Sequence, residues 1–486
     1  MTIDYHAISP ELFLSGTILL VLVADAFIRP RRKWLAMPLS FLGVLGALIA
    51  TLTLIGSDRT TFGGMYRVDN FALLFKVFFL SVALVVLAVS LRYFREGRWY
   101  QGEYYYLLLT SFLGATMMPS SRDLLMLFIS LELVSAPGFL IAAFRKSDPR
   151  SNEAGLKFFL IGVLSTAVML YGMSLIYGIT GSTNLAQIGQ VLGGTLAAGR
   201  STLADAAILF VVAGFAFKVS AVPFQFWAPD TYEGAPVPVA AYLATASKAA
   251  GFAGLLQLMF VAFPAQWAFW TPVFAALSIA TMTIGNLVAL QQRQVVRLLA
   301  YSSIAQAGYM LLPFALVSAN QAVNQDAFSA ATTYILIYAV MTLGAFAVVI
   351  ALSRESPGLQ IADFRGLMRR APVLAVAMIT FMVSLAGIPP TGGFWAKFLI
   401  FKVGIDRGGL GVALAIVMIV NSVASLYYYL LIPRETVFTG PEIARPFRSP
   451  ALVTGVAVLA TLTVLAIGVY PEIFYHYPPL STLVGH

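Results

Sequence analysis

Residues 371–404 read APVLAVAMITFMVSLAGIPPTGGFWAKFLIFKVG and are the most informative part of the chain. Two apolar halves flank a segment rich in glycine and proline at residues 387–393. Proline lacks an amide donor and clashes with the preceding helical turn, so this segment predicts two half-helices. In a membrane, such breaks occur only where protein or water satisfies the freed backbone groups. The stretch therefore predicts an interrupted membrane helix with one charged side chain, Lys397, shortly after the break.

The composition of the whole chain agrees with a membrane location. Its 486 residues are 59% hydrophobic and only 10% charged, whereas roughly 25% of the residues in a soluble domain are charged. Apolar runs of about 17–25 residues, each able to cross a hydrocarbon layer of ~30 Å, recur from end to end. Lipid offers the backbone no hydrogen bonds, and the runs are too long for barrel strands, so we expect an all-α integral membrane protein.

About fourteen spans are expected. They lie near residues 8–28, 35–55, 71–91, 104–119, 123–144, 156–179, 204–228, 237–261, 272–290, 297–317, 328–353, 371–404, 410–432 and 451–472. Pro223 interrupts the seventh span, as residues 387–393 interrupt the twelfth. Spans four to eight and nine to thirteen thus form two sets of five, each with a broken fourth member. Because five is odd, the second set enters from the opposite side, an inverted repeat that transporters use to build ion sites.

The predicted organisation has four parts. They are an N-terminal three-helix segment at 1–100, a first five-helix repeat at 101–265, a second at 266–435 and a C-terminal helix at 436–486. Arginine and lysine concentrate in alternate loops, for example after spans one, three and five. The positive-inside rule places these loops in the cytoplasm. We expect a multi-pass protein of the bacterial inner membrane with both termini on the outer side.

The sequence lacks the residues and motifs for binding haem, iron–sulfur clusters or nucleotides. The chain has no cysteine, and its histidines are only His6, His476 and His486, so no set of ligands for haem or an iron–sulfur cluster is expected. Neither a phosphate-binding P-loop nor a dinucleotide-binding glycine motif is present. The net charge of +9 is scattered between apolar spans, which argues against nucleic acid. We therefore expect no cofactor in this chain.

The cations are sorted by residue type. All 22 arginines fall in loops or at predicted helix ends, whereas six of the eight lysines fall within spans. Arginine cannot lose its proton in a protein, but a buried lysine can. Burial lowers a lysine pKa by up to about 3–5 units, into the range where protons exchange near neutrality. This sorting is what a proton path requires.

Four ionisable residues are expected deep in the membrane: Glu132, Lys218, Lys248 and Lys397. At 1.5 Å of rise per residue, Glu132 lies about 14 Å and Lys248 about 16 Å from the start of its span. Each charge at such depth costs roughly 2.5–3.5 kcal/mol, so a proton path is favoured, and structural salt bridges stay the alternative.

The other three lysines within spans have different expectations. Lys157 follows Glu153 by four residues, so either an ion pair or a part in the relay is open. Lys76 and Lys402 lie near helix ends, where we expect their long side chains to reach the membrane surface.

These residues lie in motifs that resemble a known family, the antiporter-like membrane subunits of proton-pumping NADH:quinone oxidoreductase, respiratory complex I. The motifs are FKVSAVPF at 217–224, WAPDTYEGAP at 227–236, Ser247-Lys248, LAYSSI at 299–304, and GIPP at 387–390 followed by Gly393, Phe394 and Lys397. They occur in the family's order, and the similarity runs through nearly all of the chain. It is greatest to the N-type subunit, to which subunit 2 of the chloroplast complex is related, because a lysine stands at position 397.

The resemblance implies roles for the residues. Glu132 would pair with Lys218, Lys248 would be the central relay, Lys397 the exit toward the outer side, and Lys157 an ancillary member. NADH, FMN, iron–sulfur clusters and quinone would belong to partner subunits. Gln225 and Gln306 stand where the family often has histidine, and glutamine carries no titratable proton.

The resulting hypothesis is a proton-translocating subunit of NADH:quinone oxidoreductase, embedded in lipid beside other membrane subunits. A subunit of a multi-subunit Na⁺/H⁺ antiporter or of a membrane-bound hydrogenase is the first alternative, since it would use the same lysines. A scaffold that only spaces its neighbours is the second, and it predicts that charge-removing substitutions are tolerated.

Overall fold

The computed structural model describes residues 3–28, 30–96, 102–194, 202–438, 440 and 449–472. The first half of the chain contains α1 (Ser9–Phe27), α2 (Ala36–Leu52), α3 (Asn70–Glu96), α4 (Glu103–Met117), α5 (Leu124–Ala142), α6 (Pro149–Thr180), α7 (Leu185–Gly194), α8 (Thr202–Lys218), α9 (Trp227–Gly234), α10 (Val237–Tyr242) and α11 (Lys248–Gln257). The second half contains α12 (Trp267–Ala289), α13 (Val295–Ala315), α14 (Gln321–Leu352), α15 (Leu367–Arg370), α16 (Pro372–Ala386), α17 (Gly392–Arg407), α18 (Leu410–Phe438) and α19 (Ala451–Val469).

Short elements join these helices. Single 3₁₀ turns are η1 (Pro30–Leu35), η2 (Phe62–Gly64), η3 (Met118–Ser120), η6 (Pro264–Gln266) and η7 (Ile361–Phe364). The segments η4 (Leu243–Ser247) and η5 (Leu258–Ala262) are π-helical. The strands β1 (Arg59–Thr61) and β2 (Tyr66–Val68) form an antiparallel hairpin in which Arg59 pairs with Val68.

The predicted all-α membrane fold is confirmed. Among the described residues, eleven helices are long and apolar enough to cross a membrane. The other three predicted spans are α4, which has only 15 residues, and the two interrupted helices α8–α9 and α16–α17. Both interruptions fall where proline and glycine predict them, at residues 219–226 and 387–391. The four-part division of the chain stays a prediction, and His476, His486 and the end of its last part lie outside the described residues.

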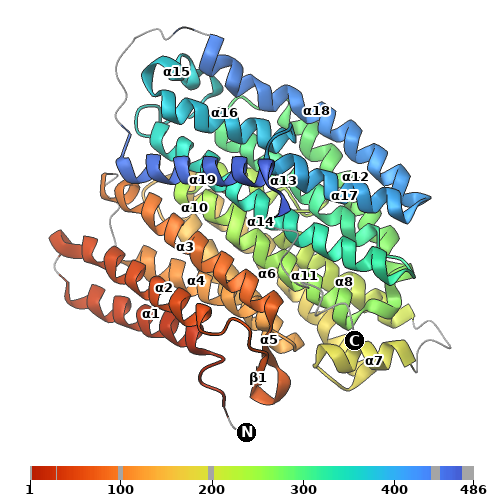
Figure 1. Cartoon of the computed structure of the whole chain (residues 1–486). Coiled ribbons are helices and arrows are strands. Elements are labelled where there is room, and N and C mark those ends of the chain that lie inside the picture. Colours follow the sequence, from red (N-terminus) through yellow and green to blue (C-terminus); the bar gives the residue numbers. More distant parts are fainter. Residues whose placement is uncertain are drawn as a thin grey trace.

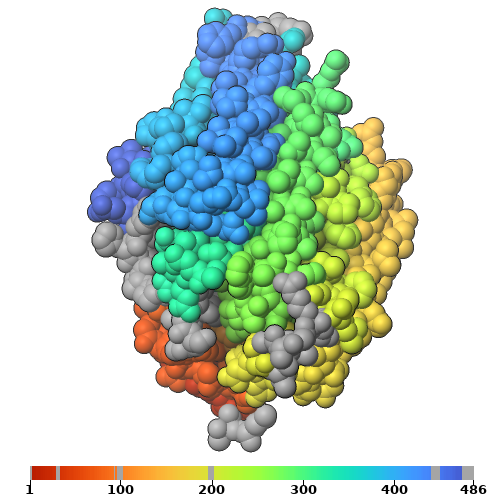
Figure 2. Space-filling view, turned by 90° about the vertical axis from the view of Figure 1, so that its right-hand side faces the viewer, coloured from red at the N-terminus to blue at the C-terminus, as the bar shows by residue number. Residues whose placement is uncertain are grey.

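Most long helices run side by side in one bundle, with α1 and α2 along one edge and α18 along the other (Figure 1). The segment from α10 to η5 is buried within the chain except at Val261, and α14 is largely buried beyond its first two turns. These two elements contact each other and form the centre of the bundle. Figure 2 shows one outer face, where residues of the second half (blue) lie against green and yellow residues from the middle of the chain.

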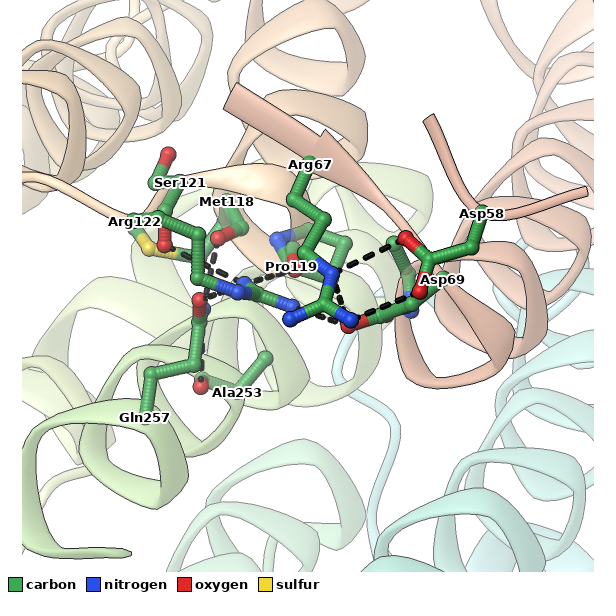
Figure 3. Close-up of polar contacts among 10 residues, drawn as sticks. Asp58, Arg67, Asp69, Met118, Pro119, Ser121, Arg122, Ala253 and Gln257 are labelled. Atoms are coloured by element: carbon green, nitrogen blue, oxygen red, sulfur yellow. Dashed lines mark hydrogen bonds and ion pairs between the residues drawn. The ribbon is translucent and has the colours of Figure 1, made fainter. Parts of the chain in front are cut away.

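The end of this central segment that lies near the hairpin is anchored by a polar network that the sequence did not predict (Figure 3). Buried Arg122 donates to Asp69 at 2.7 Å and to the side chain of Gln257 at the end of α11. On the hairpin, Arg67 donates to both carboxylate oxygens of Asp58, at 2.9 and 2.6 Å. These hydrogen bonds lower the pKa of Asp58. The network fixes α11, whose first residue is Lys248, against the loop between α4 and α5.

Candidate functional site

Lys218 is the last residue of α8, directly before the break. Its side chain is 3% exposed, and its amine donates to the Ser135 hydroxyl of α5 at 2.9 Å. The aliphatic part of Lys218 lies against Gly251 of α11, where an added Cβ would sit only 2.9 Å from the lysine Cγ. Glycine at this position therefore lets Lys218 cross the helix that begins at Lys248.

Glu132 lies one helical turn before Ser135 on α5. It is half-buried rather than buried, and its carboxylate accepts a hydrogen bond from Thr166 of α6 at 2.9 Å. Although the resemblance implies a direct Glu132–Lys218 ion pair, these two described side chains bond to Thr166 and Ser135 instead. Glu132 nevertheless stays within electrostatic reach of the Lys218 amine. The Lys218 amine thus contacts the Ser135 hydroxyl and not, as expected, the Glu132 carboxylate.

Lys248 directly follows the π-helical segment η4, and its side chain is 2% exposed. Its amine donates to the Ser303 carbonyl at 2.8 Å and to the Ser303 hydroxyl at 2.5 Å. Two buried phenols, Tyr232 and Tyr338, lie beside the same hydroxyl, and neither phenol oxygen has a hydrogen-bond partner among the described residues. Buried polar atoms without protein partners are the usual positions of internal water.

Lys397 lies in the second turn of α17, after the other break, and is 8% exposed. Its amine donates to the carbonyl of Ala386, the last residue of α16, at 2.9 Å. The amine also lies 4.8 Å from the centre of the Tyr309 ring, a favourable position for a cation. Gly387, with a φ of +89°, reverses the chain beside the lysine stem.

Each of these three lysines therefore bonds to neutral oxygen atoms, and none is in an ion pair with another described residue. Lys218 and Lys397 also lie beside the two helix interruptions, and Lys248 directly follows the π-helical segment η4. Among the described residues, no group of three or more potential metal ligands from His, Cys, Asp and Glu occurs. The arrangement suits transfer of protons between amines and hydroxyls through water.

Lys157 lies in a different environment, at the opposite end of the bundle from the hairpin. Its half-exposed amine contacts Glu153 and Asp230, each at 2.7 Å. Asp230 also accepts from Arg297 at 2.9 Å, and Arg297 reaches Glu233 at 2.8 Å. The Lys157–Glu153 pair, one of the two expectations left open for Lys157, is present as one part of a network that joins α6, α9 and α13.

The expectation for Lys76 is wrong. Its side chain does not reach the membrane surface but is wholly buried, in contact with Glu11 and with the Tyr66 hydroxyl at 2.6 Å. Lys402, in contrast, is exposed, in accord with its position near a helix end. Gln225 is half-buried, and its side-chain oxygen accepts no hydrogen bond from the part of the chain that the structure describes. Gln306 is 1% exposed and fully hydrogen-bonded.

The fold and these buried amines define a polytopic helical membrane protein with interrupted helices at its polar centre. Residues 121–423 match the family described as NADH:quinone oxidoreductase/Mrp antiporter, transmembrane. The chain belongs to this family, among its N-type subunits of NADH:quinone oxidoreductase.

Named relatives extend over most of the chain. The NADH-quinone oxidoreductase subunit N of Trichlorobacter lovleyi is 40% identical, covering 88% of this chain and 86% of the relative. Subunit N 2 of Streptomyces griseus is also 40% identical, covering 99% and 94%. The NAD(P)H-quinone oxidoreductase subunit 2 of Synechocystis is 39% identical, covering 90% and 82%.

Solved structures share the fold. A chain of respiratory complex I from Thermus thermophilus, with bound aureothin, matches with a TM-score of 0.81 at 32% identity, covering 98% of this chain and all of that one. The Mrp complex of Dietzia matches with a TM-score of 0.83 at 21% identity, covering 99% of this chain and 100% of that chain. At that identity the second likeness concerns the fold alone.

Proposed function

We propose that this chain translocates protons as a membrane subunit of NADH:quinone oxidoreductase, through Glu132, Lys218, Lys248 and Lys397. The observation that supports the proposal is that three buried lysine amines, beside the helix interruptions or the π-helical segment η4, form no ion pair with another described residue. An unpaired ammonium ion in a dry interior costs free energy, and lysine can lower this cost by releasing its proton. The amines can therefore hold and pass on protons.

In the proposed mechanism, charge changes in neighbouring subunits move Glu132 toward or away from Lys218. An approaching carboxylate retains the proton on Lys218, and a withdrawn one favours its release. The released proton passes through water to Lys248 and then to Lys397, toward the outer side. Ser135 and Ser303 hold the two inner amines in place between transfers. Lys157 is an ancillary member at the cytoplasmic end.

The surroundings of Glu132 support a neighbouring subunit on this side. A half-buried carboxylate on the surface of a membrane helix is costly against lipid. On the face of α6 that carries Thr166, Phe159 and Val163 are exposed, as expected for a surface that lipid or another membrane helix covers. We propose that a membrane subunit of the same complex covers Glu132 and supplies the coupling charge.

In this proposal, the redox reaction that supplies the energy takes place in partner subunits of the complex. The sequence contains no cysteine, the usual ligand of iron–sulfur clusters. As the resemblance implies, NADH, FMN, iron–sulfur clusters and quinone are assigned to other subunits. The protein is assigned to the bacterial inner membrane with both termini outside, on the loop charges alone. Identities of about 40% to N subunits, against 21% to the Mrp chain, favour this function over an antiporter subunit.

Lys218→Ala tests the relay itself. In the assembled complex, reconstituted into vesicles, we expect the variant to lose most of the protons pumped per NADH oxidised, because the first amine of the path is gone. The matched control is Lys402→Ala, which removes an exposed lysine from α17. Equal pumping by both variants and the wild type, with assembly intact, would instead favour the scaffold alternative.

Glu132→Gln tests the coupling charge separately from the amines. Glutamine keeps the shape and can still accept the Thr166 hydrogen bond, but it removes the negative charge. A loss of about 1.4 kcal/mol of electrostatic interaction changes the occupancy of the protonated amine ten-fold. We expect slower pumping with a changed pH profile. A wild-type rate and profile would remove Glu132 from the mechanism.

A further inference from the structure

One face of α13 links the two deepest amines. Ser303 holds the Lys248 amine, Gln306 follows one turn later, and Tyr309 follows one turn after that, with its ring beneath the Lys397 amine. The side chain of Gln306 therefore lies on the helix face between the Lys248 and Lys397 sites. It is 1% exposed, so water from outside the protein does not reach it directly.

The partners of Gln306 fix how its amide is oriented. The nitrogen donates to the Leu385 carbonyl and to the Tyr429 hydroxyl, each at 3.0 Å. The oxygen accepts from the Tyr334 hydroxyl at 2.5 Å. Because a carbonyl oxygen can only accept, the nitrogen must face Leu385. Both amide hydrogens are thus committed, and the phenol hydrogen of Tyr429 points elsewhere, where Ser302 lies 2.6 Å away.

The bond to Leu385 joins the two lysine sites. Leu385 and Ala386 are the last residues of α16, and the Ala386 carbonyl holds the Lys397 amine at 2.9 Å. Through a single side chain, the turn of α13 that carries Ser303 is therefore tied to the turn of α16 that holds Lys397. Movement of the interrupted helix at residues 387–391 would have to break this tie or carry α13 along.

An amide in this position cannot hand a proton onward. A relay group must accept a proton on one side and release one on the other, and glutamine has no titratable site for this. A hydroxyl or a water molecule could do so by reorienting, but both hydrogens of Gln306 are held by acceptors. In the arrangement seen, the direct route from Lys248 to Lys397 is closed at Gln306.

We propose that Gln306 is the gate between Lys248 and Lys397, closed by its bonds to Leu385 and Tyr429 and opened when the amide leaves Leu385, so that water connects the two amines. The gate deepens the proposed function and rests on it. Gln306 is a positioning residue, because it controls the path without carrying the proton. Because Leu385 and Ala386 are adjacent, a shift of the end of α16 that opens the gate would also move the carbonyl that holds the Lys397 amine.

Gln306→Asn tests the gate, because asparagine is one methylene shorter and cannot span the gap to Leu385. The measurement is the decay of a pre-formed pH gradient across vesicles that contain the intact complex, without NADH. The component of the decay that depends on the complex should rise about five-fold, the population change expected for one lost hydrogen bond. Gln306→Met, of similar volume but without hydrogen bonds, should leak in the same way if Gln306→Asn assembles poorly.

The matched control is Gln257→Asn, which shortens an equally buried amide at the far end of α11. It should not accelerate the decay. The double variant Gln306→Asn with Lys248→Met should return the leak to the level of Lys248→Met, since the leak uses the relay. An unchanged decay in both Gln306 variants, or a leak that persists without Lys248, would overturn the gate. Normal pumping by Lys248→Met alone would overturn the relay instead.

Discussion

Lys248→Met is expected to stop proton pumping through this chain while NADH oxidation by the assembled complex continues or slows with it. Methionine fills nearly the same volume but accepts no proton, so the segment from α10 to η5 can stay packed. Positioned proton-transfer groups typically contribute 10²–10⁴-fold to a rate, and we expect a loss of about a hundred-fold at this step. Proton uptake by reconstituted vesicles, measured per NADH oxidised, gives the result.

Lys248→Arg separates the loss of a charge from the loss of a removable proton. Arginine keeps the positive charge and can donate to Ser303, but it does not release its proton. If Lys248 serves only to hold α11 against α13, the arginine variant should pump better than the methionine variant. We expect both to fail alike. Substantial pumping by Lys248→Arg would contradict a relay through this position.

The interrupted helices and the central lysines could be predicted because their signals are local. Pro223 and the proline- and glycine-rich segment 387–393 favour a local helix break, although Pro137 leaves α5 continuous. One lysine in a long apolar run must be buried or reach the surface. Lys218, Lys248 and Lys397 lie too far from the ends of their predicted spans to reach the surface, and the structure buries all three.

The partners of these residues could not be predicted, because they depend on packing between distant segments. Ser303 reaches Lys248 across 55 residues, and Ser135 reaches Lys218 across 83. Neither serine belongs to a pattern of charge or periodicity. The π-helical segments also leave no mark in the sequence. The half-exposure of Glu132 depends on which surface of α5 the other helices leave uncovered.

Lys76 shows most clearly where local reasoning fails. Its place in the second turn of α3 favours a side chain that reaches the membrane surface, but Glu11 of α1 lies 65 residues away and meets it inside the bundle. The Tyr66 hydroxyl of β2 adds a second contact at 2.6 Å. The side chains are 0% and 10% exposed, so the pair ties α1, α3 and the hairpin together in a dry environment.

Glu11→Gln is therefore expected to destabilise the chain strongly. Removing one partner leaves the other charge buried and uncompensated, which typically costs about 3–5 kcal/mol. The double variant Glu11→Gln with Lys76→Met removes both charges and should recover most of this loss. Glu103→Gln, which breaks the exposed pair with Lys146, is the control and should cost less than about 1 kcal/mol. The midpoint of thermal unfolding of the purified complex ranks the stability of the wild type and the three variants. A Glu11→Gln variant as stable as the wild type would contradict a buried ion pair.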